Sequence, residues 1–170
     1  MKPDVHVSYI LKIAYGRLWA ISRLKTANVP NNDILHFFNV KIRSVLEYAA
    51  PVFTSMLTVE NKIDIERTQK IALKVILNDE YSTYDQACAA LNTLSLESRR
   101  KDLSLNFALK CLKSEAHNHF FKQRTSTYYQ LRKIKAFEEP FCHSERYNTS
   151  PIPYFTRLLN EHFSKMTGSY

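Results

Sequence analysis

Helical spacing of apolar side chains is the feature that most restricts what this chain can fold into. Over the first two thirds of the sequence apolar residues recur every three or four positions, as Val7, Ile10, Leu11 and Ala14 do near the N-terminus. No segment shows the two-residue alternation of a half-buried strand. The sequence therefore predicts an all-α core, a helical bundle of about five helices. We expect these helices at residues 7–24, 32–50, 59–77, 83–91 and 96–116.

Residues suited to helix termini support these positions. A side-chain oxygen at the N-cap accepts a hydrogen bond from the first turn of a helix. Pro51 has no backbone N–H to donate, so we expect it to end or kink the second helix. The predicted caps are Asn31 or Asn32, Thr58, Ser82 and Ser95.

The pattern changes after about His117, where no sustained period remains. Residues 117–150 hold scattered charges and aromatics, whereas the stretch from Pro151 to Phe163 has apolar residues at helical spacing. We therefore expect two parts, a helical domain over residues 1–116 and an irregular C-terminal tail over residues 117–170 with one terminal helix.

The sequence offers no residues for phosphate-loop or polymerase chemistry. Its two glycines, Gly16 and Gly168, stand alone, which excludes a glycine-rich loop that cradles phosphates. Catalytic sites for nucleotidyl transfer need clustered carboxylates to hold divalent metal. The acidic pairs at residues 79–80 and 138–139 are isolated, so we predict no catalytic residue and no enzyme activity in this chain.

Sulfur and histidine residues raise the question of zinc. Zinc-knuckle spacing of the Cys-x-x-Cys kind is absent, so we predict no metal site. Three widely spaced cysteines do not make a disulfide framework, and no stretch reaches the roughly 20 apolar residues that cross a bilayer. We expect no membrane partner and an intracellular location, in the cytoplasm, the nucleus or both. The residues considered for zinc are Cys111, His117, His119, Cys142 and His143.

Basic residues give the chain a net charge of +8 and lie in rows on the expected helices. The segment 97–137 alone holds 10 basic and 3 acidic side chains. Basic rows beside an aromatic ring suit binding to a phosphate backbone, although solvated helix faces are commonly charged as well. The candidate nucleic-acid-binding residues are Lys12, Trp19, Arg23, Arg67, Lys70, Lys74, Arg99, Arg100, Lys110 and Lys113.

Five segments of the sequence together carry a family resemblance. Residues 42–53 (IRSVLEYAAPVF) resemble a segment downstream of the catalytic palm in the reverse transcriptases of non-LTR (LINE-type, jockey-like) retrotransposons. Four further segments follow in the family's order. These are residues 65–72 (IERTQKIA), 81–87 (YSTYDQA), 94–100 (LSLESRR) and 148–155 (NTSPIPYF).

The resemblance implies the thumb and C-terminal region of such an RNA-directed DNA polymerase, without its palm. A thumb is a helical bundle that would hold an RNA/DNA template–primer duplex through its backbone. Magnesium would then belong to the palm, a partner in cis or in trans, and no cofactor is expected in this segment. Two alternatives remain open, a helical protein-interaction module and a non-functional remnant of a truncated retroelement.

Overall fold

The computed structural model describes residues 3–124 and 135–167, and its regular elements over these residues are helices, with no strand. The predicted all-α class is confirmed. The chain divides into two compact units. Unit 1 comprises residues 1–50 and 57–100, and unit 2 comprises residues 51–56 and 101–170. This division falls inside a helix, after residue 100, and side chains of residues 105–112 contribute to the core of unit 2.

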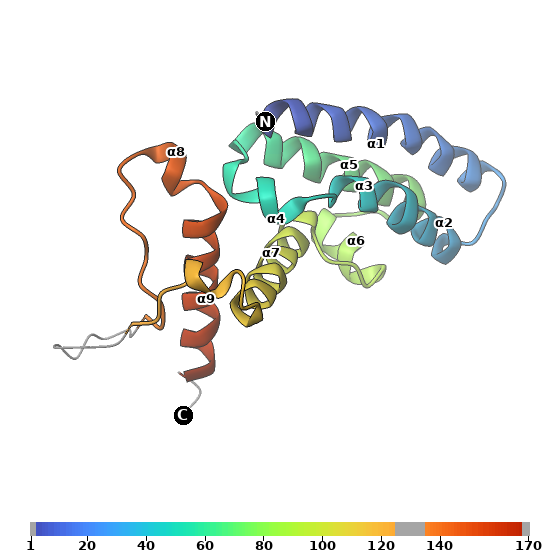
Figure 1. The fold of residues 1–170 in the computed structure, drawn as a ribbon. Coiled ribbons are helices and arrows are strands. Elements are labelled where there is room, and N and C mark those ends of the chain that lie inside the picture. Colours follow the sequence, from blue (N-terminus) through green and yellow to red (C-terminus); the bar gives the residue numbers. More distant parts are fainter. Residues whose placement is uncertain (1–2, 125–134, 168–170) are drawn as a thin grey trace. The chain divides into compact units, whose positions relative to one another are not determined.

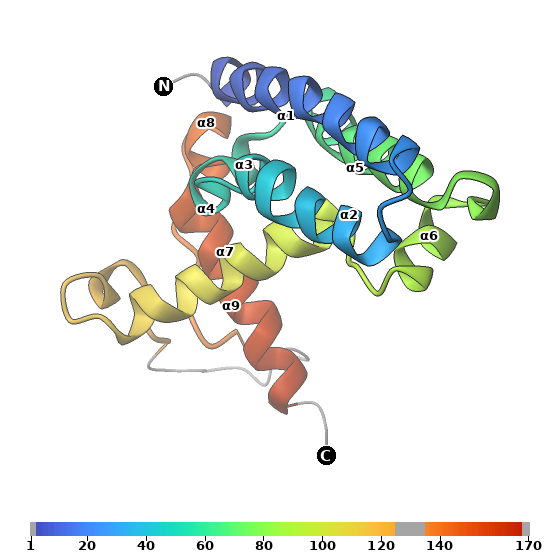
Figure 2. The ribbon, with the colours of Figure 1, turned by 90° about the vertical axis from the view of Figure 1, so that its right-hand side faces the viewer.

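Unit 1 is built around two long helices that lie side by side, α1 (Pro3–Thr26) and α5 (Val59–Leu77) (Figures 1 and 2). A helical stretch made of α2 (Asn31–Phe37), a π-helical turn (Phe38–Arg43) and α3 (Ser44–Leu46) packs against α1. The short helix α6 (Tyr84–Ala90) packs against α5. The faces that the helices of unit 1 turn toward one another are almost completely shielded from water. The fully buried apolar residues include Ile10, Ala14, Ile21, Ile34, Phe38, Ile42, Leu46, Ile65, Ala72, Leu73 and Ile76.

Two of the predicted helix caps are confirmed. The Thr58 hydroxyl accepts a hydrogen bond from the N–H of Asn61 at 3.2 Å, and the Ser95 hydroxyl accepts one from the N–H of Ser98 at 3.2 Å. Thr58 begins α5, and Ser95 precedes α7 (Leu96–Lys113). Each bond satisfies an N–H that has no partner within its own helix.

The other two caps are wrong by one position. Pro30, not an asparagine, precedes α2, and it makes no side-chain cap bond. Thr83, not Ser82, caps α6 by accepting from the N–H of Gln86 at 3.4 Å. In both places adjacent residues suit a turn about equally well, so the sequence does not decide which of them takes the extended conformation of the cap.

The second predicted helix ends earlier than expected. It stops at Leu46, and Ala49 takes a left-handed conformation with φ of 57°, which reverses the chain. Pro51 consequently lies in the first turn of α4 (Ala50–Phe53), where its missing N–H is tolerated. The helix thus ends before the proline, and Ala49 is exposed.

Unit 2 has a small aromatic core between the second half of α7 and α9 (Pro151–Thr167), which confirms the predicted terminal helix. Phe121 and Phe137 come from the irregular segment and pack with Ala108, Phe155 and Leu159. The irregular segment also contains the short helix α8 (Glu145–Asn148).

A buried side chain fixes part of this irregular segment to α9. Asn160 accepts a hydrogen bond from the N–H of Phe137 at 2.8 Å and donates one to its carbonyl at 3.1 Å. The amide thus satisfies both backbone groups of a buried residue that lies outside any helix. Within the described part of the chain, no helix is long and apolar enough to cross a bilayer.

Candidate nucleic-acid interface

The outward side of α1 carries an aromatic ring beside a cation. Trp19 is 65% exposed, and the guanidinium carbon of Arg23 lies 5.1 Å from the centre of its indole. Lys12 is exposed two turns before Trp19 on the same side of the helix, opposite the buried stripe. These three predicted contacts therefore lie on one face, accessible to solvent.

A second row of cations lies on the outward side of α5. Arg67, Lys70 and Lys74 are exposed and three or four residues apart, and we call them the α5 row. The Lys70 ammonium lies 5.0 Å from the centre of the Tyr84 ring, which holds it by a cation–π contact. Among the described residues, none of the three makes an ion pair with a carboxylate.

Arg99 is placed differently, because a carboxylate in the same unit already binds it. Its guanidinium is bidentate to Glu47, with Nε bonded to Oε1 and Nη2 to Oε2, the second at 3.0 Å. Arg43 adds a longer contact to the same carboxylate at 3.9 Å. The half-buried Arg99 thus joins α7 to the end of α3, and its charge is compensated within the protein.

Arg100 is not a surface residue at all. It is 2% exposed and its Nη2 lies 3.9 Å from Oε2 of Glu66. Burial lowers the pKa of the Arg100 guanidinium, and the nearby Glu66 carboxylate opposes that shift. A phosphate cannot reach a side chain enclosed in this way, so we leave Arg100 out of the interface; the amphipathic spacing had placed it with the exposed cations.

Glu66 is the important residue that the sequence did not single out. Its Oε1 accepts from the N–H of Leu96 at 3.0 Å and from the Tyr84 hydroxyl, and its Oε2 accepts from the N–H of Glu97 at 3.1 Å. A carboxylate from α5 therefore caps the N-terminus of α7, where the helix dipole favours negative charge.

Around Glu66 lies a half-buried polar cluster. Gln69, itself fully buried, donates from Nε2 to the Tyr84 hydroxyl at 3.0 Å and to the carbonyl of Leu94 at 2.9 Å. Burial first, and the hydrogen bond to Glu66 second, raise the pKa of the Tyr84 phenol far above its ordinary value. The cluster keeps α5, α6 and the start of α7 together, which is a structural role.

The remaining two candidates belong to unit 2. Lys110 and Lys113 are exposed in the last turn of α7, where a positive charge also suits the helix dipole. They lie in the other unit from the rows on α1 and α5, so we treat them separately.

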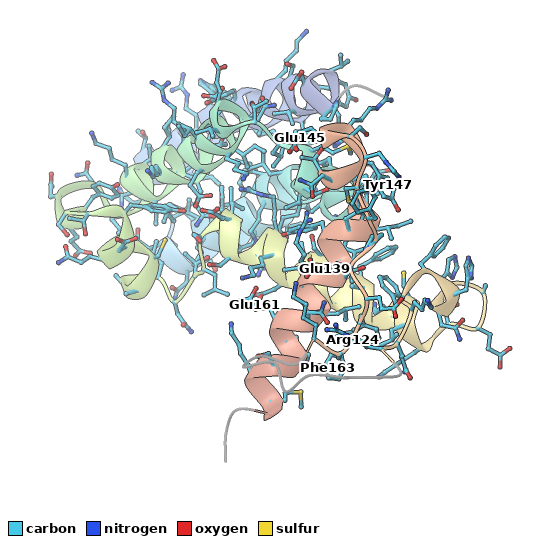
Figure 3. All side chains as sticks on the ribbon, turned by 90° about the vertical axis from the view of Figure 1, so that its left-hand side faces the viewer. Arg124, Glu139, Glu145, Tyr147, Glu161 and Phe163 are labelled. Atoms are coloured by element: carbon cyan, nitrogen blue, oxygen red, sulfur yellow. The ribbon has the colours of Figure 1, made fainter. Side chains whose placement is uncertain are left out.

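Unit 2 also has a charged pocket with a volume of 320 Å³. Glu161, labelled in Figure 3, lies on its wall and binds Lys101 and Lys165 at 3.0 Å each. These two hydrogen-bonded lysines lower the pKa of the Glu161 carboxyl. The Arg157 guanidinium donates to the side-chain oxygen of Asn148 at 2.9 Å and to the Asn148 carbonyl at 2.8 Å. These charged side chains of the pocket wall thus already have partners within unit 2.

The part of the chain that the structure describes contains no cluster of three or more His, Cys, Asp or Glu side chains suited to a metal. The three cysteines are free and half-buried.

Comparison of the chain with protein-family profiles, with curated proteins and with solved structures found no match.

Proposed function

We propose that unit 1 binds nucleic acid through its phosphate backbone, without reading the bases, as the thumb of a reverse transcriptase would. The observation that carries this proposal is the division of its cations into two sets. Arg99 and Arg100 are held by carboxylates, whereas Lys12, Arg23 and the α5 row are exposed and make no ion pair with a described residue.

Cations that have no internal carboxylate are available to displace the counterions condensed on a polyanion. The row geometry adds to this, because side chains three or four residues apart on a straight helix follow a line, as phosphates do along a strand. The resemblance to non-LTR retrotransposon reverse transcriptases supports the same partner, an RNA/DNA template–primer duplex. Under this proposal polymerization belongs to a palm domain elsewhere, and the chain itself is a binding module.

The test is the affinity for an RNA·DNA hybrid duplex as a function of salt. We expect the dissociation constant to rise steeply between ~50 and ~200 mM salt, with each phosphate contact adding ~0.9 to the slope of the logarithmic plot. The double variant Lys70→Gln/Lys74→Gln should lower that slope by about 2.

Lys165→Gln is the matched control, since that lysine is exposed but already bound to Glu161. It should leave the slope unchanged. A slope near zero for the unmodified protein, or equal slopes for the double variant and the control, would contradict the proposal.

A protein-interaction module is the competing function, and one observation favours it. Val59 and Ile63, one turn apart on α5, are 73% and 60% exposed beside a pocket of 310 Å³. Exposed apolar side chains that adjoin a pocket can mark a protein-binding surface. The variant Ile63→Ser separates the two functions, because it should leave duplex affinity and its salt slope unchanged if the cation rows bind nucleic acid.

A further inference from the structure

The outward side of α1 presents more aromatic surface than backbone binding requires. Tyr9 is 63% exposed, Tyr15 is 40% exposed and Trp19 is 65% exposed. Burying such rings is strongly favourable, so a solvated series of them on one helix is unusual for a surface without a partner. We call the exposed residues Tyr9, Lys12, Tyr15, Gly16, Trp19 and Arg23 the α1 ridge.

Helix geometry places these residues along one line. Positions three, four or seven apart share a face, which relates Tyr9 to Lys12 and Gly16, and relates Tyr15 to Lys12 and Trp19. With a rise of 1.5 Å per residue, Tyr9 and Trp19 lie about 15 Å apart along the axis. The ridge is therefore long enough to contact several consecutive nucleotides of an extended strand.

The charge of the ridge suits a polyanion. Asp4 is the sole acidic residue of α1, and its carboxylate accepts a hydrogen bond from Asn61 of α5 at 2.8 Å. Lys12 and Arg23 lie among the exposed rings and make no ion pair with a described residue. Rings and cations thus lie next to one another on this face, as bases and phosphates do along a single strand.

Gly16 is the second independent feature of the ridge. Glycine inside a helix costs about 1 kcal/mol relative to alanine. A Cβ added at Gly16 would meet nothing within 4 Å, so packing within the protein does not require this glycine. The missing side chain leaves a gap in the ridge between Lys12 and Trp19, where a ligand can approach the helix backbone.

Trp19 and Arg23 form a ready pair for one nucleotide. The guanidinium, 5.1 Å from the ring centre, orients the indole while most of that side chain stays exposed. A base can stack on the ring while its own phosphate binds the neighbouring guanidinium. A duplex offers only its backbone to such a convex helix, since its bases are stacked on one another and enclosed.

We infer that the α1 ridge binds single-stranded nucleic acid, with bases stacked on Trp19 and Tyr15 and phosphates bound by Lys12 and Arg23. This inference rests on the proposed function and adds the strand form that α1 takes. The α5 row binds backbone in either form. The ridge distinguishes an unpaired strand by its bases.

The experiment uses the fluorescence of Trp19, the sole tryptophan of the chain. Three probes of equal length are titrated: an oligo(dT), an abasic oligonucleotide with the same phosphates, and an RNA·DNA duplex. Oligo(dT) should quench the tryptophan emission, and the abasic strand should bind more weakly without quenching. Equal binding of oligo(dT) and the abasic strand with unchanged emission would overturn the inference.

Variants localize the effect, with affinity measured on labelled probes. Trp19→Ala should weaken oligo(dT) binding about tenfold, as the loss of one stacked base does, and leave duplex binding within twofold. Trp19→Phe should restore most of the loss. Gly16→Leu should keep the helical circular dichroism signal and weaken oligo(dT) binding by closing the gap.

Phe141→Ala is the matched control, because Phe141 is 78% exposed but belongs to unit 2. It should change the affinity for neither oligo(dT) nor the duplex. If the duplex binds with the expected salt slope while Trp19→Ala leaves oligo(dT) binding unchanged, the ridge inference is wrong and the proposed function stands. If no probe binds, both are wrong.

Discussion

Two regions of unit 1 carry similar basic residues and treat them in opposite ways. Lys12, Arg23 and the α5 row are exposed and make no ion pair with a described residue. At the start of α7, in contrast, Arg99 and Arg100 are bound to Glu47 and Glu66. The difference shows that a basic pattern is not itself a binding site. What matters is whether the fold brings a carboxylate to it.

The largest expected effect comes from removing the half-buried carboxylate of Glu66. Glu66→Ala removes the carboxylate that pairs with the buried Arg100 and two of the hydrogen bonds at the N-terminus of α7, so the free energy of unfolding of unit 1 should fall by about 3 kcal/mol. Chemical denaturation followed by Trp19 emission measures it. Glu80→Gln is the control, because Glu80 is an exposed carboxylate of unit 1, and it should change stability by less than ~0.5 kcal/mol. Similar values for the two variants would remove the distinction between bound and free charge.

A smaller effect should separate two arginines. Arg99→Gln breaks the bidentate bond to Glu47, which is largely shielded from water, and should cost about 2 kcal/mol. Arg67→Gln removes a solvated charge of the α5 row and should cost less than ~0.5 kcal/mol. The same denaturation measurement checks both. A large loss for Arg67→Gln would mean that the α5 row serves stability.

Alkaline pH tests the polar cluster behind these arginines. The pKa of Tyr84 is raised above its ordinary value of 10.0, by burial first and by Glu66 second, and burial also raises the pKa of Cys88 above 9.0. A group whose pKa is raised in the folded protein contributes its full stability at any pH below its ordinary pKa. That stability is lost as the pH rises above about 9 to 10. The thermal unfolding midpoint should therefore fall as the pH is raised above about 9.

Tyr84→Phe sharpens this test. It should cost about 1 kcal/mol at neutral pH, because Glu66 and Gln69 each lose a hydrogen bond. The variant should then lose less stability than the unmodified protein as the pH rises. Parallel curves for the two proteins would show that Tyr84 does not contribute to the alkaline loss.

The smallest expected effect is a gain. Gly16→Ala fills an open position on α1 and should raise the free energy of unfolding by about 0.8 kcal/mol. Circular dichroism during denaturation measures it. A loss of stability would mean that the glycine is needed for the fold, which would remove one support of the α1 ridge as a binding surface.

Much of the fold follows from the sequence, because long amphipathic helices are set by local periodicity. The positions of α1, α5 and α7 and the caps at Thr58 and Ser95 are examples. The left-handed conformation of Ala49 was missed, since it is unfavourable for an alanine and no local pattern indicates it. The aromatic core of unit 2 was missed because Phe121 and Phe137 lie in a segment without a period.

The candidate interface was predicted less well, for a related reason. Exposure of Lys12, Trp19 and the α5 row follows from helical spacing alone. The enclosure of Arg100 depends on Glu66, which lies 34 positions earlier in the chain, and on Gln69 and Tyr84 around it. Periodicity in a single sequence relates residues that lie within a few turns of one helix. It therefore does not predict that a carboxylate from another helix pairs with Arg100.

The border between the two units runs through α7, between Arg100 and Lys101. No loop is available there for a cut, and trimming the protein at that point would sever a helix of 18 residues. A shortened version meant to keep unit 1 intact should therefore retain the chain through Lys113. We therefore expect proteases to cleave slowly between Arg100 and Lys101, although the border between the two units lies there.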